Sequence, residues 1–384
     1  MNEWPTIPLS QTTRFVVDNR GKTAPTAAYG VPLIATNCVD NESLYPTFSN
    51  LRYVSQETYE MWFRSHPEPN DIILTLKGSQ NGATCLVPSP VNFAIAQDMV
   101  ALRVNEDVMH YAFLLAALRS SDLQAEIKNL DVSGVIPHLK KSDFDKLFVP
   151  CPPIAIQRSI GRLYLDFCLK IDLLQRQNTT LETMAETLFR QWFVEEASDN
   201  WEEGALGEVI EIFDGKRIPL SKMEREKRKD GTLYPYYGAA TIMDYVNDYI
   251  FDGDYILMGE DGTVRTDEGL PVLQYATGKF WVNNHAHVLK AKPPYSDFLI
   301  WKYLSRTNID EIVTGAVQPK INQGNLKSLP FPRFPPDLVR QFNSATIPLR
   351  SRIHQNSKSI RTLEKLRDTL LPKLMSGEVR VQYD

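Results

Sequence analysis

The sequence contains one pattern twice, and this duplication restricts the fold more than any other feature. A shift of 182 residues, without a gap, superimposes prolines, leucines and a Thr-Leu-Glu run from two segments. The matched pairs are Pro137 and Pro319, Leu147 and Leu329, Pro150 and Pro332, Pro153 and Pro335, Arg158 and Arg340, Ile171 and Ile353, Thr180 and Thr362, Leu181 and Leu363, Glu182 and Glu364, Thr187 and Thr369, and Leu188 and Leu370. A single offset over so long a span predicts a tandem duplication.

Each copy begins with a globular region and ends with a long helix. Upstream of the ungapped match, residues 71–74 resemble residues 254–257, an extended β-type run that precedes a polar loop with glycine. Strand-like runs broken by Gly, Pro and Asn extend through residues 1–150 and 200–335. A pair of adjacent prolines precedes the helical periodicity in both copies. The sequence therefore predicts an α+β chain with two strand-rich domains and a pseudo-two-fold internal repeat.

Apolar residues in both helical segments recur at alternating spacings of three and four, the pattern of a coiled-coil seam. The residues chosen for helix pairing are Leu174, Asn178, Leu181, Asn356, Ile360 and Leu363. An Asn in each seam fixes the register at a cost in stability. We predict antiparallel pairing, with Asn178 opposite Asn356 and Leu174 opposite Ile360. The alternative is that each helix packs separately against its own domain.

A proline interrupts the second helical pattern. Pro348 lacks the backbone N–H that an interior helical residue donates, so we expect it to break or kink the helix near its start. The long part should then run from about Leu349 to the Ser376-Gly377 pair, because glycine commonly ends helices. A helix of about forty residues is on the order of 60 Å long. Two such helices would hold the two domains at a fixed separation.

Length, charge and hydropathy restrict the class of protein. A chain of 384 residues is long enough for two or more hydrophobic cores. The net charge of -5 disfavours a uniformly basic surface but does not exclude a local nucleic-acid site. The sequence shows neither a long apolar run nor a signal-peptide pattern, so we expect a cytoplasmic protein with no membrane contact. The four cysteines lack CxxC spacing, which disfavours a zinc site and favours reduced thiols.

No motif carries a complete catalytic or metal site, so we predict no catalytic residue, metal or cofactor in this chain. Residues 292–295, Lys-Pro-Pro-Tyr, resemble an amino-methyltransferase signature, but a lysine cannot accept hydrogen bonds from the target amino group. Residues 21–23 lack the upstream glycine of a phosphate-binding loop. His285 and His287 should share one face of a strand, but no third ligand with suitable spacing accompanies them.

Polar loops in both domains offer the side chains that read DNA bases. Direct readout uses Arg or Lys at guanine, Asn or Gln at adenine, and a carboxylate at cytosine. The first-domain candidates are Lys22, Thr23, Lys77, Gly78, Ser79, Gln80 and Asn81. The second-domain candidates are Lys216, Arg217, Glu260, Asp261, Arg265, Asn283, Asn284 and His285. For each of them, an ordinary loop residue that satisfies local hydrogen bonds is the alternative.

Two basic segments suggest further contacts with DNA or with a partner subunit. Residues 216–229 contain seven basic residues, offset in part by Glu224 and Glu226. Phosphate contact there predicts a strong salt dependence of binding, and a solvated loop is the alternative. Residues 340–373 carry eight basic residues against Glu364 and Asp368, a net charge of +6. This second segment either lies over DNA or docks a partner subunit.

The C-terminal segment carries the most specific family resemblance. Residues 363–378, Leu-Glu-Lys-Leu-Arg-Asp-Thr-Leu-Leu-Pro-Lys-Leu-Met-Ser-Gly-Glu, resemble the distal conserved region of type I restriction–modification specificity subunits. Residues 318–323 resemble the close of a target-recognition domain in that family, and residues 234–238, 249–261 and 283–287 are similar to one common variety of that domain. The resemblance adds Tyr237, Gln318, Lys320, Asn322 and Gln323 to the DNA-binding candidates. It covers nearly the whole chain, although His138-Leu139-Lys140-Lys141 depart from the family's Lys-Ile-Asn-Gln pattern in the first domain.

The resemblance implies a domain order and a set of partners. It implies target-recognition domain 1 at 1–150, a proximal conserved helix at 151–197, target-recognition domain 2 at 198–335 and a distal conserved helix at 336–384. Each recognition domain would read one half of a bipartite, asymmetric site in double-stranded DNA. The partners would be two modification (methyltransferase) subunits, which carry S-adenosylmethionine, and restriction/translocase subunits. The alternative is a structural coiled-coil adaptor of a DNA-modifying complex without base readout.

Overall fold

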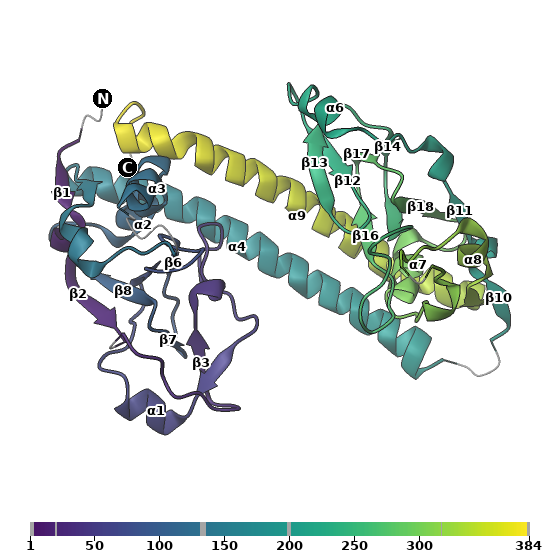
Figure 1. Ribbon diagram of the computed structural model, residues 1–384, viewed down its shortest axis with the longest axis horizontal. Helices are drawn as coiled ribbons and strands as arrows, with labels where there is room; N and C mark the ends of the chain where they lie inside the picture. The colour runs from purple at the N-terminus through teal and green to yellow at the C-terminus, as the bar shows by residue number, and fades with distance from the viewer. Residues whose placement is uncertain (1–3, 20, 131–135, 198–200, 316, 382–384) are drawn as a thin grey trace. The chain divides into compact units, whose positions relative to one another are not determined.

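The computed structural model describes residues 4–19, 21–130, 136–197, 201–315 and 317–381. The chain forms two compact units. Unit 1 consists of Met1–Arg176 together with Asn356–Asp384, and unit 2 consists of Gln177–Gln355. The two longest helices, α4 (Ile154–Arg190) and α9 (Pro336–Ser376), therefore each contribute one half to each unit (Figure 1). The two units group residues that contact one another, so they do not test the domain boundaries that the sequence predicts along the chain. Those boundaries stay predictions.

Unit 1 is built on two small sheets and a two-stranded ribbon. The first sheet has the order β2-β8-β5-β6, and all its neighbouring strands are antiparallel. The second has the order β4-β3-β7, in which β3 and β7 are parallel. The strands are β1 (Thr6–Pro8), β2 (Thr13–Asp18), β3 (Val31–Ile34), β4 (Arg52–Val54), β5 (Ile72–Thr75), β6 (Thr84–Leu86), β7 (Ala94–Ile95), β8 (Met99–Val104) and β9 (Phe148–Pro150), and β1 pairs with β9. The helices are α1 (Gln56–Met61), α2 (Tyr111–Arg119) and α3 (Ser121–Asn129), with 3-10 turns η1 (Leu9–Thr12), η2 (Thr36–Cys38) and η3 (Lys141–Asp145).

Unit 2 has the same arrangement. Its sheets have the orders β11-β18-β15-β16 and β13-β12-β17-β14, with β12 and β17 parallel, and β10 pairs with β19. The strands are β10 (Glu203–Ala205), β11 (Ile210–Ile212), β12 (Tyr234–Tyr237), β13 (Ile242–Val246), β14 (Phe251–Asp252), β15 (Tyr255–Gly259), β16 (Leu273–Ala276), β17 (Lys279–Val282), β18 (Ala286–Ala291) and β19 (Pro330–Pro332). The helices are α5 (Leu206–Val209), α6 (Lys222–Glu226), α7 (Asp297–Leu304) and α8 (Gln323–Ser328), with short turns η4 (Gln191–Glu195), η5 (Asp214–Lys216) and η6 (Asp310–Ile312).

The main sheets and the parallel strand pairs of the two units repeat one topology, and unit 2 adds β14 at the edge of its second sheet. In chain order, β2, β5, β6 and β8 of unit 1 occupy the sheet positions of β11, β15, β16 and β18 of unit 2. The parallel pair β3–β7 likewise corresponds to the parallel pair β12–β17. In each unit, a helix after the last strand of the main sheet and a final short strand then precede the long helix. The predicted duplication and its α+β fold class are thus confirmed.

The two long helices pack antiparallel. In unit 1, Ile160 and Tyr164 near the start of α4 share a hydrophobic core with Leu371 and Leu374 near the end of α9. In unit 2, Phe189 near the end of α4 lies in one core with residues near the start of α9. The start of each helix thus packs with the end of the other, as Figure 1 shows.

The residue-by-residue register of the helix pair stays a prediction. Among the residues predicted for pairing, Leu174 and Asn356 are buried, and the other four are half-buried. Burial of this kind agrees with a seam, but it does not assign opposite partners.

The predicted break of the second helix at Pro348, with the long part starting at about Leu349, is wrong, whereas a kink at Pro348 stays a prediction. Helix α9 starts at Pro336 and continues through Pro348 to Ser376. Pro336 suits the first turn of α9, because the N–H that a proline lacks has no helical partner there. At Pro348 only one backbone hydrogen bond is lost, and packing on both sides, by Phe342 and Ile353, keeps the helix in place. The expected end is confirmed: Gly377, with φ of 80°, follows the last helical residue.

No helix in the described ranges is long and apolar enough to cross a membrane. The four cysteines are free thiols, three of them buried.

The helix-pair core of unit 2 can be tested at Phe342, which is fully buried against Phe189, Phe193 and Trp192. Phe342→Ala removes a large aromatic ring from a closely packed site, so we expect it to lower the free energy of unfolding by about 3–5 kcal/mol. Urea unfolding followed by tryptophan fluorescence measures this, because Trp192 reports on the same core. The control Leu366→Ala alters a half-exposed side chain of the same helix and should cost about 1 kcal/mol or less. Equal losses for the two variants would contradict the assigned packing.

Candidate nucleic-acid interface

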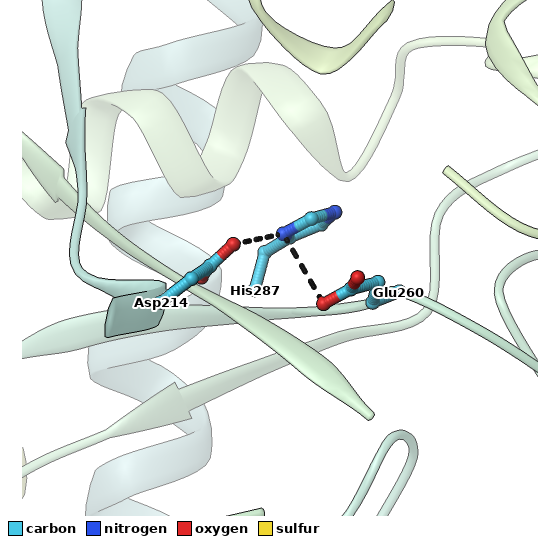
Figure 2. Close-up of side chains that lie close together, drawn as sticks. All are labelled: Asp214, Glu260 and His287. Carbon is cyan, nitrogen blue, oxygen red and sulfur yellow. Dashed lines mark hydrogen bonds and ion pairs between the residues drawn. The ribbon is translucent and has the colours of Figure 1, made fainter. Parts of the chain in front are cut away.

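A buried charged cluster lies beneath the predicted DNA-binding loops of unit 2. Asp214 comes from η5, Glu260 follows β15, and His287 lies on β18 (Figure 2). The Nδ1 atom of His287 lies 2.6 Å from Oδ2 of Asp214 and 3.7 Å from Oε2 of Glu260. Its Nε2 atom lies 2.8 Å from the carbonyl oxygen of Ile321. The side chain of His287 is fully buried.

These contacts define the hydrogen bonds of the His287 ring. A carbonyl oxygen can only accept, so Nε2 of His287 donates to Ile321. Asp214 also acts as an acceptor, because its carboxylate receives the backbone N–H of Val288 at 2.9 Å and the amide of Gln323 at 2.7 Å. Nδ1 of His287 makes the third hydrogen bond to this carboxylate, beside those from Val288 and Gln323. Burial raises the pKa of Asp214, but its hydrogen bond to His287 and the nearby positive charges outweigh burial, and the net shift is downward.

A guanidinium pairs with both carboxylates. Nη1 of Arg217 lies 2.5 Å from Oε2 of Glu260, and Nη2 lies 3.6 Å from Oδ2 of Asp214. Nη1 also donates to the carbonyl of Ala286 at 2.7 Å. The buried carboxylate of Asp214 and the half-buried carboxylate of Glu260 therefore both have partners within the chain. These partners are His287, Arg217 and Lys320, whose ammonium lies 3.6 Å from Oε1 of Glu260. Asp214, Glu260 and His287 are close enough together to hold a metal ion, but the two carboxylates already pair with His287, Arg217 and Lys320, so we interpret the cluster as a salt-bridged network.

The backbone above this network joins the segments that were predicted to bind DNA. The N–H of Glu260 donates to the carbonyl of His285, and the N–H of Ile321 donates to the carbonyl of Glu260, both at 2.9 Å. The N–H of Gly262 donates to the carbonyl of Pro319 at 3.0 Å. We call the backbone held by these three hydrogen bonds the loop frame. On the outside of this frame, Nδ1 of His285 lies 2.5 Å from Oδ1 of Asp261.

Several second-domain candidates thus lie together, although they are far apart in the sequence. The residues gathered on or beneath this frame are Arg217, Glu260, Asp261, Asn284, His285, Lys320, Asn322 and Gln323.

The expectation that His285 and His287 share one strand face is wrong. His285 precedes β18 and is exposed, whereas His287 lies within the strand and is buried. The turn at residues 283–285 changes the direction of the chain just before the strand, so alternation by two does not extend back to His285. Sequence reasoning therefore missed the buried role of His287 and of Asp214.

Other second-domain candidates have local partners. Asn283 is buried, and its Oδ1 accepts the backbone N–H of His285 at 2.8 Å. Asn322 caps α8, because its side chain accepts the N–H of Asn325 at 2.8 Å. The ammonium of Lys216 lies 5.1 Å from the ring centre of Phe213.

The remaining second-domain candidates lie around these. Arg265 pairs with Asp310, Tyr237 packs edge-on against Phe280, and Gln318 is exposed. These placements do not test DNA contact, which stays a prediction for each residue.

The first-domain candidates form an equivalent loop in unit 1. Lys77 bridges to His138, and the N–H of Gly78 donates to the carbonyl of Pro137 at 3.0 Å. Oδ1 of Asn81 accepts the N–H of Leu139 at 3.2 Å. In the same loop, the carbonyl of Gln80 accepts the hydroxyl of Thr75, and Ser79 is exposed.

Two further first-domain candidates lie in a separate turn. Lys22 is exposed, and the hydroxyl of Thr23 accepts the side-chain amide of Gln97 at 3.3 Å.

Part of the basic segment 216–229 is neutralised within unit 2. Asp244 on β13 pairs with Arg225 and with Lys229, and Arg228 pairs with Asp248 at 3.5 Å. The hydrogen bond from Lys229 is the largest influence on Asp244 and lowers the pKa of its carboxyl to about 2. Of these ion pairs, the one between Arg225 and Asp244 joins α6 to β13, and the other two hold the residues that follow α6.

Comparison with known proteins identifies the family. The sequence profile of the type I restriction modification DNA specificity domain matches residues 24–183 and again residues 198–341. The chain belongs to this family. The two matches fall on the two copies of the repeat described above.

Individual relatives agree with this assignment. A Haemophilus influenzae protein named as a candidate type I restriction enzyme specificity subunit is 34% identical over 127 residues, 33% of this chain and 31% of that relative. The MjaIX specificity subunit of Methanocaldococcus jannaschii is 23% identical over 70% of this chain and 69% of its own length. The aligned part thus spans about a third of one relative and about two thirds of the other. A solved type I S subunit from M. genitalium shares the fold, with a TM-score of 0.63 at 17% identity over 97% of this chain and 96% of that one.

The buried network predicts a pH-dependent stability difference. His287→Gln leaves the Asp214 carboxylate buried without its His287 partner, so we expect a loss of about 3–5 kcal/mol in unfolding free energy at pH 7. The lowered pKa of Asp214 stabilises the folded wild type above the ordinary pKa of aspartate, and this contribution is lost as the pH falls through the lower, folded value. The difference in unfolding free energy between the wild type and His287→Gln should therefore become smaller as the pH falls.

Urea unfolding across a pH series measures this difference. The control is His354→Gln, which alters an exposed histidine and should have little effect at any pH. A difference that does not change with pH would rule out the proposed ion pair between His287 and Asp214.

Proposed function

We propose that this chain is the DNA-specificity subunit of a type I restriction–modification complex, and that each unit reads one half of a bipartite, asymmetric site in double-stranded DNA. The observation that carries the proposal is the duplication of one loop frame, at residues 76–78 with 137–139 in unit 1 and at residues 260–262 with 319–321 in unit 2. Two copies of one frame, bearing different exposed side chains, suit the recognition of two different short sequences by the same kind of contact.

The chain itself would perform no catalysis. In our proposal, it positions partner subunits that act on DNA in the cytoplasm. Modification subunits would supply S-adenosylmethionine and adenine methylation, and restriction/translocase subunits would supply cleavage. The chain's own contribution is selection of the site, through phosphate contacts that orient each unit and base contacts that specify it.

Repeat-related grooves on the long helices suit two copies of one partner. The groove on α4 in unit 2 is lined by Thr179, Thr180, Thr183, Met184, Thr187 and Leu188. The groove on α9 in unit 1 is lined by Lys358, Arg361, Thr362, Lys365, Leu366, Thr369 and Leu370. The 182-residue shift of the repeat places Met184 on Leu366 and Leu188 on Leu370. We propose that each groove docks one modification subunit, which explains why two copies would bind a single chain.

The proposed function predicts a two-part methylation motif. The chain is co-expressed with its modification subunit, and N6-methyladenine is mapped across the host genome by single-molecule sequencing. We expect two short specified segments separated by a spacer of fixed length and undefined sequence. Replacing residues 1–150 with the corresponding region of another family member should change one segment and leave the other unchanged. A continuous motif, or methylation without any motif, would favour the adaptor alternative.

The docking grooves predict a change in stoichiometry. Met184 and Leu366 are each close to half exposed, so a charge at either position should repel an apolar partner surface without unfolding the chain. We expect Met184→Glu and Leu366→Glu each to retain one modification subunit, and the double variant to retain none. Native mass spectrometry of the purified complexes counts the subunits. Met61→Glu, at a methionine that is 77% exposed on α1, is the control and should retain both. Two bound subunits in the double variant would disprove the docking proposal.

A further inference from the structure

Three positions in unit 1 are structurally equivalent to three positions in unit 2. The N–H of Leu76 donates to the carbonyl of Asp98 at 2.8 Å, and the N–H of Glu260 donates to that of His285 at 2.9 Å. Residue 98 therefore corresponds to residue 285. Lys77 and Asp261, the next residues along the two loops, form equivalent backbone bridges to His138 and to Lys320. The equivalent pairs are thus 77 with 261, 98 with 285, and 138 with 320.

The same three kinds of charged or ionisable side chain occupy these positions in a different order. Unit 1 has Lys77, Asp98 and His138. Unit 2 has, at the equivalent positions, Asp261, His285 and Lys320. Each set contains one carboxylate, one imidazole and one ammonium group, but no position keeps the same group. We call each set a triplet.

The interior beneath the triplets does not require this permutation. Glu260 and His287 of the buried network correspond to Leu76 and Val100 in unit 1, because Met258 pairs with His287 as Leu74 pairs with Val100. The frame is therefore supported by ion pairs in unit 2 and by apolar packing in unit 1. The same backbone frame forms over both interiors, so the frame itself does not require one particular order of the triplet side chains. In unit 2 the triplet also contacts the network, because the ammonium of Lys320 lies 3.6 Å from Oε1 of Glu260.

The triplets also lie where another molecule can approach closely. Lys77, His285 and Lys320 are exposed, and the other three members are half-buried. Beside residues 77 and 261, Gly78 and Gly262 have φ of 91° and 76°, and a Cβ atom on either glycine would have no neighbour within 4 Å. Glycine is suited to these positive φ values, and it leaves open space over the loop. A fixed frame with open surroundings and variable charged groups is the arrangement expected of a recognition surface.

We propose that the two triplets are the principal base-reading positions of the chain, and that their permutation makes the two half-sites different. This inference rests on the proposed function. At the first position, the ammonium of Lys77 is a donor suited to O6 and N7 of guanine, whereas the carboxylate of Asp261 is an acceptor suited to the amino group of cytosine. In unit 2, the bond from His285 fixes the orientation of Asp261 and holds one of its two oxygens.

The proposal is tested by exchanging charges at the first position. The full chain, assembled with its modification subunits, selects binding sites from a randomised DNA duplex, so that the result does not depend on methylation. Asp261→Lys should convert a cytosine preference into a guanine preference at one base pair of one half-site, with a change in discrimination of about tenfold or more. Lys77→Asp should produce the reverse conversion in the other half-site.

Matched variants exclude simpler explanations. Asp267→Lys introduces the same charge change at an exposed residue of the same loop, outside the triplet, and should leave base preference unchanged. The unaltered half-site provides an internal measure of folding in every complex. Should a lysine variant select no motif, the isosteric Asp261→Asn is used instead, with loss of the cytosine preference in that half-site as the expected result.

The failure of this inference can be distinguished from the failure of the proposed function. A wild-type complex that selects no two-part motif would overturn the proposed function. Only the triplet proposal would be overturned if the wild-type complex selects such a motif and the variants select the same one. The variants in question are Asp261→Lys and Lys77→Asp, or Asp261→Asn where it is used instead. A change in both half-sites from a single substitution would also overturn it.

Discussion

The packing of the chain's last helix into the core formed by its first half is the constraint on which the architecture depends. Leu371, Leu374 and Met375 belong to the same hydrophobic cluster as Ile160 and Tyr164. Unit 1 is thus discontinuous in sequence, and the chain must return antiparallel to α4 to complete it. In unit 2 the other ends of the two helices pack together: the end of α4 and the start of α9 share a core rich in aromatic rings. The helix pair therefore belongs to both hydrophobic cores and is more than a linker.

The two units show that one backbone frame can be stabilised in two ways. In unit 2, His287 and Arg217 pair with Asp214 and Glu260 in a buried network, and the strength of such a network depends on every member having its partner. In unit 1, Leu76 and Val100 occupy the positions of Glu260 and His287. Unit 2 should consequently be the more sensitive of the two to substitution and to pH, even though both share the same topology.

The sequence predicted the architecture well, because the repeat offset reflects real equivalence. Pro137 and Pro319, matched by the 182-residue shift, accept equivalent backbone hydrogen bonds from Gly78 and Gly262. Local rules were less successful where tertiary packing opposed them. Pro348 did not end the helix, because neighbouring side chains on both sides are buried in the core.

The buried cluster could not be found from spacing alone. Asp214, Glu260 and His287 come from three segments, and only sheet pairing brings them together. A weak signal was present, since a histidine within an otherwise apolar strand requires a polar partner when it is buried.

The discontinuity of unit 1 has a consequence for the order of folding during synthesis. Domains in a growing chain generally fold as they emerge, beginning at the N-terminus. Here residues 177–355 form a contiguous unit that is complete before the last turns of α9 leave the ribosome, whereas unit 1 lacks Leu371, Leu374 and Met375 until those turns have been made. The part of the chain made first is therefore finished last. A chain that stops before Leu371 would carry an incomplete first core beside a complete second one.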